Sequence, residues 1–222
     1  MVDGTLIVFK EKPALDRVKS MSYFNYRKQK YGFQATVVCD DEARILKFNC
    51  SYPGAVHDAR AWRKLGVYRH PQRYLRGNEF LLADSAYPLT ETTIVPYKHS
   101  SAHLSPSKRM FNYRLSGLRV SVEHCIGHLK ARFPSLRGLP HRIRRKRDVA
   151  LCMKWVGSCV VLYNLLLDLD DDIEARWEMS EDGGSLEDED EISECANIGR
   201  ESEGKKKRNV MMREVVAEER DY

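Results

Sequence analysis

The sequence predicts a mixed α/β domain followed by an acidic tail. Short apolar runs rich in strand-forming residues occupy the first half of residues 1–168, and two long helical periodicities occupy the second half. The composition turns acidic, with Gly and Ser, over residues 169–222, where we expect disorder. A chain of 222 residues with 42% hydrophobic content is long enough to bury a core, so we expect one domain with a sheet flanked by helices.

The strands are expected in four short segments. Residues 5–9 are an apolar run, and residues 31–39 and 44–50 are two further runs joined by the polar turn 40–43, which predicts a β-hairpin. Residues 80–83 form a continuous apolar run that is typical of a strand buried on both faces. The sequence between the first strand and the hairpin is basic and predicts no regular element.

Two long helices are expected in the second half of the domain. Apolar residues recur every three or four positions over 112–132, which predicts an amphipathic helix. Residues 149–168 are apolar almost all round, so we expect a buried helix with Asp148 as its N-cap. Cys152 and Cys159 are seven residues apart and therefore share one face of this helix, where we expect core thiols.

The charge of the chain is divided between the two regions. Residues 1–167 hold 29 Lys and Arg residues against 12 Asp and Glu residues, a net charge of +17. Residues 168–222 hold 8 against 20, a net charge of −12. A basic body favours a polyanion such as DNA as the partner, because clustered cations displace counterions from phosphates. A solvated basic surface without such a partner is an equal alternative.

Membrane and secreted classes of protein are not predicted. No stretch of 18 residues is free of charge, and the first residues do not resemble a secretory signal. The six cysteines form no Cys-x-x-Cys pair, which is typical of a reducing intracellular compartment. Residues 205–208 (Lys-Lys-Lys-Arg) have the composition of a nuclear localisation signal, so we expect the protein in the nucleus.

Two carboxylates stand out because the basic body has few acidic residues. Asp84 directly follows the apolar run 80–83, where a charge is costly unless it caps a helix, pairs with an arginine or holds a metal. Glu123 lies four residues after Arg119 on the predicted helix 112–132, so an ion pair within the helix is one interpretation. A strand-end Asp facing a helix Glu is also how oxygen-rich Mg²⁺ sites are built. The residues alone leave these alternatives open.

Several sequence blocks, in order, carry a resemblance to a known family. The blocks are Asp3-Gly4-Thr5, residues 53–60 (Pro-Gly-Ala-Val-His-Asp-Ala-Arg), 82–88 (Leu-Ala-Asp-Ser-Ala-Tyr-Pro), Phe111-Asn112, 119–123 (Arg-Val-Ser-Val-Glu), 126–133 and 161–164 (Val-Leu-Tyr-Asn). Together they cover about residues 1–168. In this order they resemble the DDE endonuclease domain of PIF/Harbinger-type transposases and their domesticated nuclease relatives.

The resemblance implies an RNase H-like fold and a metal-dependent DNA endonuclease. Asp3, Asp84 and Glu123 match the family's three catalytic acids and are expected to hold Mg²⁺ or Mn²⁺, and Asp58 matches a further acidic position. Two such ions about 3.5–4 Å apart activate water and neutralise the leaving 3′-oxygen. Strand transfer would reuse this site with a DNA 3′-hydroxyl as the nucleophile. The expected phosphate contacts are Arg119, Lys130, Arg132, Arg142, Arg144, Arg145, Lys146 and Arg147.

The resemblance also sets expectations about completeness and partners. Family members carry a substantial region, often with a helix-turn-helix segment, before the position that Asp3 occupies, so we expect an N-terminally truncated fold. The alternative function is that of an inactive derivative that acts as a DNA-binding or interaction protein. A Myb-like DNA-binding protein, which some relatives use, and a second copy of the chain are the expected protein partners. His124 and His128 have the spacing of zinc ligands, but two surface histidines are the favoured interpretation.

Overall fold

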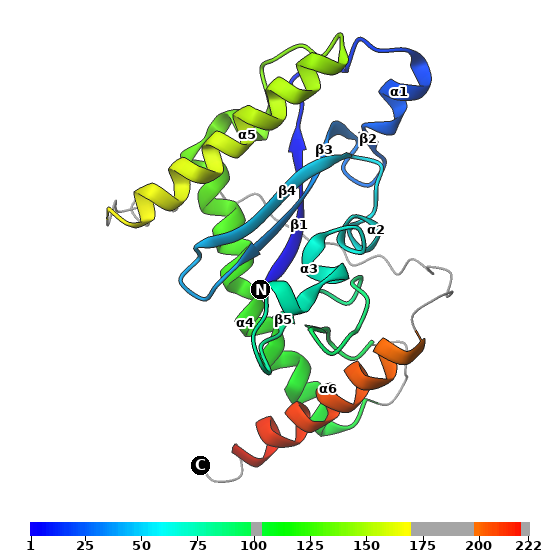
Figure 1. Cartoon of the computed structure of the whole chain (residues 1–222), viewed down its shortest axis with the longest axis vertical. Helices are drawn as coiled ribbons and strands as arrows, with labels where there is room; N and C mark the ends of the chain where they lie inside the picture. Colours follow the sequence, from blue (N-terminus) through cyan, green and yellow to red (C-terminus); the bar gives the residue numbers. More distant parts are fainter. Residues whose placement is uncertain (99–103, 170–197, 219–222) are drawn as a thin grey trace. The chain divides into compact units, whose positions relative to one another are not determined.

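The computed structural model describes residues 1–98, 104–169 and 198–218 (Figure 1). Contacts divide the chain into two units that interleave in sequence. The large-sheet unit comprises residues 3–61 and 121–185. The small-sheet unit comprises residues 1–2, 62–120 and 186–222. Strands and helices occur in both units, which confirms the expected mixed α/β class.

A four-stranded sheet forms the centre of the large-sheet unit. Its strands are β1 (Val2–Val8), β2 (Phe24–Asn25), β3 (Lys30–Cys39) and β4 (Ile45–Pro53). The central strand β3 pairs with the other three, and its antiparallel pairing with β4 runs from Phe33 opposite Pro53 to Cys39 opposite Ile45. The predicted hairpin is therefore confirmed. Eight successive residues of β3 are buried, which explains why this run carries few polar side chains.

Helix α5 (Lys146–Leu167) is anchored on the β3–β4 hairpin by one face. The Asn164 amide donates to the Ile45 carbonyl at 2.8 Å and accepts from the Ile45 N–H at 3.0 Å, so it satisfies both backbone groups of that residue. The Tyr163 hydroxyl donates to the Ala43 carbonyl at 3.1 Å in the turn of the hairpin. Cys152 and Cys159 lie on the same buried face, so the prediction of core thiols is confirmed.

The start of α5 and its burial differ from the prediction. The helix begins at Lys146, and Asp148 lies in its first turn, where the carboxylate accepts the N–H groups of Arg144 and Arg145, both at 2.8 Å. Asp148 therefore acts as the acidic residue of a capping box, which lies in the first helical turn and accepts backbone N–H groups at the helix start. It is not the N-cap. The expected all-round burial is wrong, because one apolar face of α5 is exposed.

The length and composition of α5 would also allow it to cross a membrane, and it is the only such helix in the described ranges. This is weak evidence, because core helices of water-soluble proteins pass the same test. The bonds of Asn164 and Tyr163 to the hairpin are those of a core helix.

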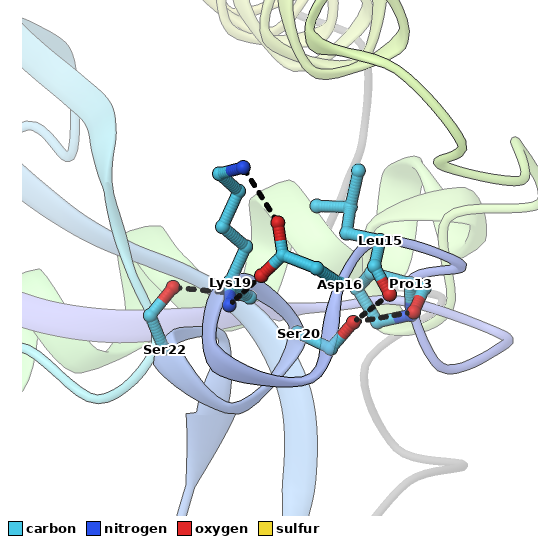
Figure 2. Close-up of polar contacts among 6 residues, drawn as sticks. All are labelled: Pro13, Leu15, Asp16, Lys19, Ser20 and Ser22. Atoms are coloured by element: carbon cyan, nitrogen blue, oxygen red, sulfur yellow. Dashed lines mark hydrogen bonds and ion pairs between the residues drawn. The ribbon is translucent and has the colours of Figure 1, made fainter.

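The segment between β1 and β3 is more regular than the sequence indicated. It contains α1 (Arg17–Ser22), which Asp16 caps by accepting the N–H of Lys19 at 2.9 Å. Figure 2 shows this cap together with the Ser20 hydroxyl, which bonds to the carbonyls of Pro13 and Leu15. An aspartate three residues before a backbone donor is the sequence signal that predicts such a start.

The small-sheet unit is built on two short parallel strands. Leu81 and Leu82 of β5 (Leu81–Leu82) pair with Thr93 and Ile94 of β6 (Thr93–Ile94). The helices are α3 (Gly66–Arg69), the 3₁₀ helix η1 (Pro71–Arg73), the first part of α4 (Pro106–Arg132) and α6 (Ile198–Glu218). Helix α4 starts six residues before the predicted helix and continues into the large-sheet unit, where α2 (Asp58–Trp62) and the 3₁₀ helix η2 (Pro134–Arg137) complete the elements.

Helix α6 lies within the range where we expected disorder, so that expectation is wrong for residues 198–218. Gly204 lies against the backbone of Thr90, where an added Cβ would come within 2.7 Å of the carbonyl carbon. The Tyr97 hydroxyl donates to Asn209 at 2.6 Å, and the Arg208 guanidinium lies 3.9 Å from the centre of the Tyr97 ring. These contacts explain how a polar helix is held. The rest of the tail, 170–197 and 219–222, lies outside the described residues.

Candidate active site

Asp58 contacts β1 of the large-sheet unit at the residue that follows Asp3. Asp3 lies within β1, and its carboxylate accepts the N–H of Gly4 at 2.7 Å. Asp58 is the first residue of α2, and its carboxylate lies directly against Gly4. A Cβ on Gly4 would stand only 1.7 Å from Asp58 Oδ1, so glycine is the one residue that allows this approach. The Asp-Gly and His-Asp blocks of the sequence therefore meet at one point.

Gln34 fixes the Asp58 carboxylate from the central strand. Its side-chain amide donates to Asp58 Oδ1, and the residue itself is buried on β3. A buried amide with a carboxylate partner holds that carboxylate in one orientation. The role of Gln34 was not predicted from the sequence. Its signal was an amide side chain within a mostly apolar strand.

Lys130 on α4 reaches the strand that carries Asp3. Its ammonium donates to the Thr5 hydroxyl at 2.6 Å and to the Leu6 carbonyl at 3.2 Å. Burial, together with the nearby positive charges of Lys28 and Arg137, lowers the pKa of Lys130 to about 8, and the charge of Asp3 acts in the opposite direction. Lys130 is therefore a half-buried residue whose amine lies between the helix and β1, and its expected phosphate contact stays a prediction.

The buried amine predicts a specific pH dependence of stability. The pKa of Lys130 falls from 10.5 to about 8 on folding, so between these values the unfolded chain binds more protons than the folded one. The free energy of unfolding, taken relative to Lys130→Met, should therefore rise with pH by up to about 1.4 kcal/mol per unit. Urea unfolding at pH 7.5 to 10.5 measures this. Lys10→Met, at an exposed lysine of the same unit, should show no such trend, and parallel curves for the two variants would contradict the prediction.

Glu123 lies on the face of α4 that carries Lys130, at the Asp3 end of the strand. Cys125 contacts Cys39, whose electrostatic neighbours include Asp3, and Lys130 contacts Thr5, so α4 runs in the direction of β1 (Figure 1). Seven residues are about two helical turns, so Glu123 and Lys130 share a face. Asp3 and Thr5 likewise share one face of the strand. Glu123 is exposed, so a metal ion or a substrate could reach its carboxylate from solvent.

Asp84 belongs to the small-sheet unit, where it follows β5. Its carboxylate lies 3.9 Å from the Arg119 guanidinium and accepts the N–H of Ser85. The Asp84 side chain is 38% exposed and that of Arg119 is 13% exposed. Of the alternatives that the sequence left open, the arginine partner is therefore present. Arg119 is largely buried beside Asp84, and its expected phosphate contact stays a prediction.

The carboxylates can be compared with the needs of a divalent metal. Across the residues with described positions, no three His, Cys, Asp or Glu side chains lie close enough together to hold an ion. Among the described residues, His124 and His128 therefore have no third side chain of these types in position to complete a zinc site. Asp3 on β1 and Asp58 beside Gly4 both carry hard oxygen donors, which are the ligands that Mg²⁺ and Mn²⁺ prefer. Whether Asp84 and Glu123 join them as ligands stays a prediction.

Most of the other expected phosphate contacts are accessible. Arg142, Arg144, Arg145, Lys146 and Arg147 are exposed and lead into α5. Arg142 forms an ion pair with Glu11 at 3.3 Å, and Arg147 lies 3.8 Å from Asp148. Arg132 is half-buried at the end of α4. The basic stretch 142–147 is therefore the part of this set that is free to face a polyanion.

Several residues of the motif blocks form contacts with the backbone of other segments. Asn112 binds both backbone groups of Tyr97 at 2.8 Å, as Asn164 does for Ile45. Gly54 donates to the Gly32 carbonyl at 2.9 Å, and an added Cβ would come within 2.6 Å of the Tyr23 carbonyl oxygen. The motif blocks therefore contain structural residues beside the acids.

Comparison with known proteins gives a family and two distant relatives. A family model described as DDE superfamily endonuclease matches residues 2–164. "Protein ALP1-like" of Arabidopsis thaliana is 24% identical over 150 residues, which are 60% of this chain and 35% of that protein. "Putative nuclease HARBI1" of Mus musculus is 23% identical over 150 residues, which are 68% of this chain and 41% of that protein. The chain thus spans well under half the length of these relatives. No solved structure matches it.

Proposed function

Because the chain belongs to the DDE superfamily endonuclease family, we propose that it hydrolyses DNA phosphodiester bonds with the help of Mg²⁺ or Mn²⁺. The observation that carries the proposal is that Asp58 lies against Gly4, the residue next to Asp3 on β1, while α4 runs along the Asp3 and Thr5 face of the same strand. We further propose that the domain has an RNase H-like fold. The sheet order with β3 between β1 and β4 supports this.

The four candidate acids would have different roles in this reaction. Asp3, Asp84 and Glu123 would hold the metal, and Asp58 would assist as a neighbouring charge. A bound ion would activate water and stabilise the leaving 3′-oxygen. Gln34 and Gly4 keep the Asp58 carboxylate in place before any substrate arrives, which is the preorganisation that such chemistry requires. Transfer of a DNA strand would use the same carboxylates with a 3′-hydroxyl in place of water.

The first experiment is nicking of supercoiled plasmid DNA with Mg²⁺ or Mn²⁺. We expect conversion to the open circle that EDTA abolishes, measured by gel electrophoresis. A folded chain that binds DNA and nicks none would refute the nuclease proposal. That result would support the second candidate function, an inactive derivative that binds DNA, which the exposed basic stretch 142–147 favours.

The partners and the location of the protein are also proposals. We propose DNA as the substrate, a Myb-like protein as a DNA-targeting partner and the nucleus as the location. Lys207 donates to the Asn78 carbonyl at 3.0 Å and Arg208 to that of Pro96 at 3.2 Å, so two of the four basic residues at 205–208 are engaged by the small-sheet unit. Lys205 and Lys206 are exposed. Imaging of a fluorescent fusion with and without Lys205→Ala and Lys206→Ala tests whether this run directs import.

A further inference from the structure

Cations of helix α6 lie over aromatic rings of the small-sheet unit, to which the helix itself belongs. The distances to the ring centres are 6.0 Å from Arg200 to Tyr68, 5.0 Å from Lys207 to Phe80 and 3.9 Å from Arg208 to Tyr97. A cation within about 6 Å of a ring centre is attracted by the electron-rich face of the ring. Charged side chains therefore help to hold α6, whereas the helices of a hydrophobic core are held by apolar side chains.

The surroundings of Tyr97 form a binding site for a guanidinium group. Arg208 Nη1 donates to the Val95 carbonyl at 3.3 Å and to the Pro96 carbonyl at 3.2 Å. The same guanidinium lies over the Tyr97 ring. Asn112 binds both backbone groups of Tyr97 at 2.8 Å and so fixes this segment. A planar guanidinium stacks on a ring and donates hydrogen bonds at the same time, so the site matches arginine better than lysine.

Apolar side chains of α6 extend the contact along the helix. Met211, Met212 and Val215 are partly buried against a buried cluster of the small-sheet unit, whose members are Ile94, Tyr97, Phe111 and Leu115. Gly204 lies against the backbone of Thr90. The contacting positions of α6 are thus 204, 208, 211, 212 and 215. They recur every three or four residues, which is the pattern with which an amphipathic helix binds to the surface of another protein.

The docking site and the helix that fills it lie in different parts of the sequence. The family model matches residues 2–164, which include Val95, Tyr97 and Asn112, whereas α6 begins at Ile198. A ligand on the same chain as its site binds without the entropy cost of bringing two molecules together. Partly buried anchors are therefore enough to hold such a helix, and they leave it able to dissociate.

We propose that the small-sheet unit carries a docking site for an amphipathic helix that bears an arginine, and that α6 is a reversible ligand of this site within the same chain. A ligand of the site presents its arginine to the Tyr97 ring and apolar residues three, four and seven positions later, as α6 does with Met211, Met212 and Val215. The proposal does not depend on the proposed nuclease function.

A fluorescent peptide of residues 198–218 tests the proposal on the full chain, with binding measured by anisotropy. The parent chain should bind it weakly, because the tethered α6 competes for the site. Arg208→Ala in the chain weakens this competitor and should raise the affinity for the peptide by on the order of tenfold. Arg213→Ala, at an exposed cation of the same helix, should bind like the parent. A peptide with Arg208→Lys should bind the Arg208→Ala chain on the order of tenfold more weakly than the parent peptide.

A second release variant leaves Arg208 in place. Gly204→Ala in the chain should also raise the affinity for the peptide, because an added Cβ would come within 2.7 Å of the Thr90 carbonyl carbon. Gly117→Ala, at an open position of α4 in the same unit, should not. Tyr97→Leu added to Arg208→Ala removes the ring and should cancel the gain.

Near-ultraviolet circular dichroism of the same variants shows whether the unit keeps its tertiary structure without α6. Loss of that structure in both Arg208→Ala and Gly204→Ala would overturn the proposal, because α6 would then be a permanent part of the fold. Folded release variants that bind no peptide would overturn it as well. Equal affinity for the parent peptide and the Arg208→Lys peptide would show that the site does not recognise arginine.

Discussion

Replacing Asp84 by asparagine should lower metal-dependent nicking by on the order of a thousandfold, because loss of a metal ligand removes several kcal/mol of transition-state stabilisation. The fold should survive. Asparagine keeps the oxygen that accepts the Ser85 N–H and that lies 3.9 Å from the Arg119 guanidinium, so both groups keep a polar neighbour. Initial rates of nicking and thermal melting measure the two effects separately.

Matched controls decide whether the loss is specific. Asp3→Asn should reproduce the loss from the other unit, where the asparagine oxygen can still accept the Gly4 N–H. Glu91→Gln and Asp41→Asn remove exposed carboxylates from the small-sheet and large-sheet units and should leave nicking unchanged. Equal loss in all four variants would indicate a general effect of charge. Full activity in Asp84→Asn would remove Asp84 from the site.

The hairpin was predictable because its information is local. The polar turn 40–43 stands between two apolar runs, and the structure pairs them from Phe33 opposite Pro53 onward. Helix α4 was predictable over most of its length for the same reason, since its apolar residues repeat at helical spacing. In both cases the element needs little from the rest of the chain to be recognised.

The features that were not predicted depend on contacts between segments that are distant in sequence. The nearly all-apolar composition of α5 indicated burial, but composition alone does not distinguish the buried face of this helix from its exposed apolar face. Helix α6 is polar and looked disordered, because its stability comes from Tyr97, Thr90 and other residues about a hundred positions earlier. The pairing of Arg119 with Asp84 was not predicted because the two residues are distant in sequence. Composition does not report contacts between remote segments.

For the candidate acids, too, the sequence predicted some features and did not predict others. The motif blocks singled out Asp3, Asp58, Asp84 and Glu123. The match to the family model confirms the resemblance to the family. The contact that joins Asp58 to Gly4, and the role of Gln34 in holding it, required the fold. The first of these contacts leads to the sharpest test of the site.

Gly4→Ala should displace Asp58, because the new methyl group would stand 1.7 Å from Asp58 Oδ1. The carboxylate would have to turn away and lose the Gln34 amide, which leaves a buried donor unsatisfied and costs about 1–3 kcal/mol of the free energy of unfolding. Gly138→Ala is the control in the same unit, because an added Cβ there meets nothing within 4 Å. It should change stability little.

A double-mutant cycle separates this clash from any other effect of the substitution. In an Asp58→Ala background the carboxylate is absent, so Gly4→Ala should lose most of its cost and the two changes should be strongly non-additive. Additive costs, measured by urea unfolding, would mean that Asp58 does not lie against Gly4. Nicking by the same variants below their melting temperatures then assigns Asp58. Activity that falls with its displacement makes it part of the site, whereas unchanged activity leaves it a structural link between α2 and β1.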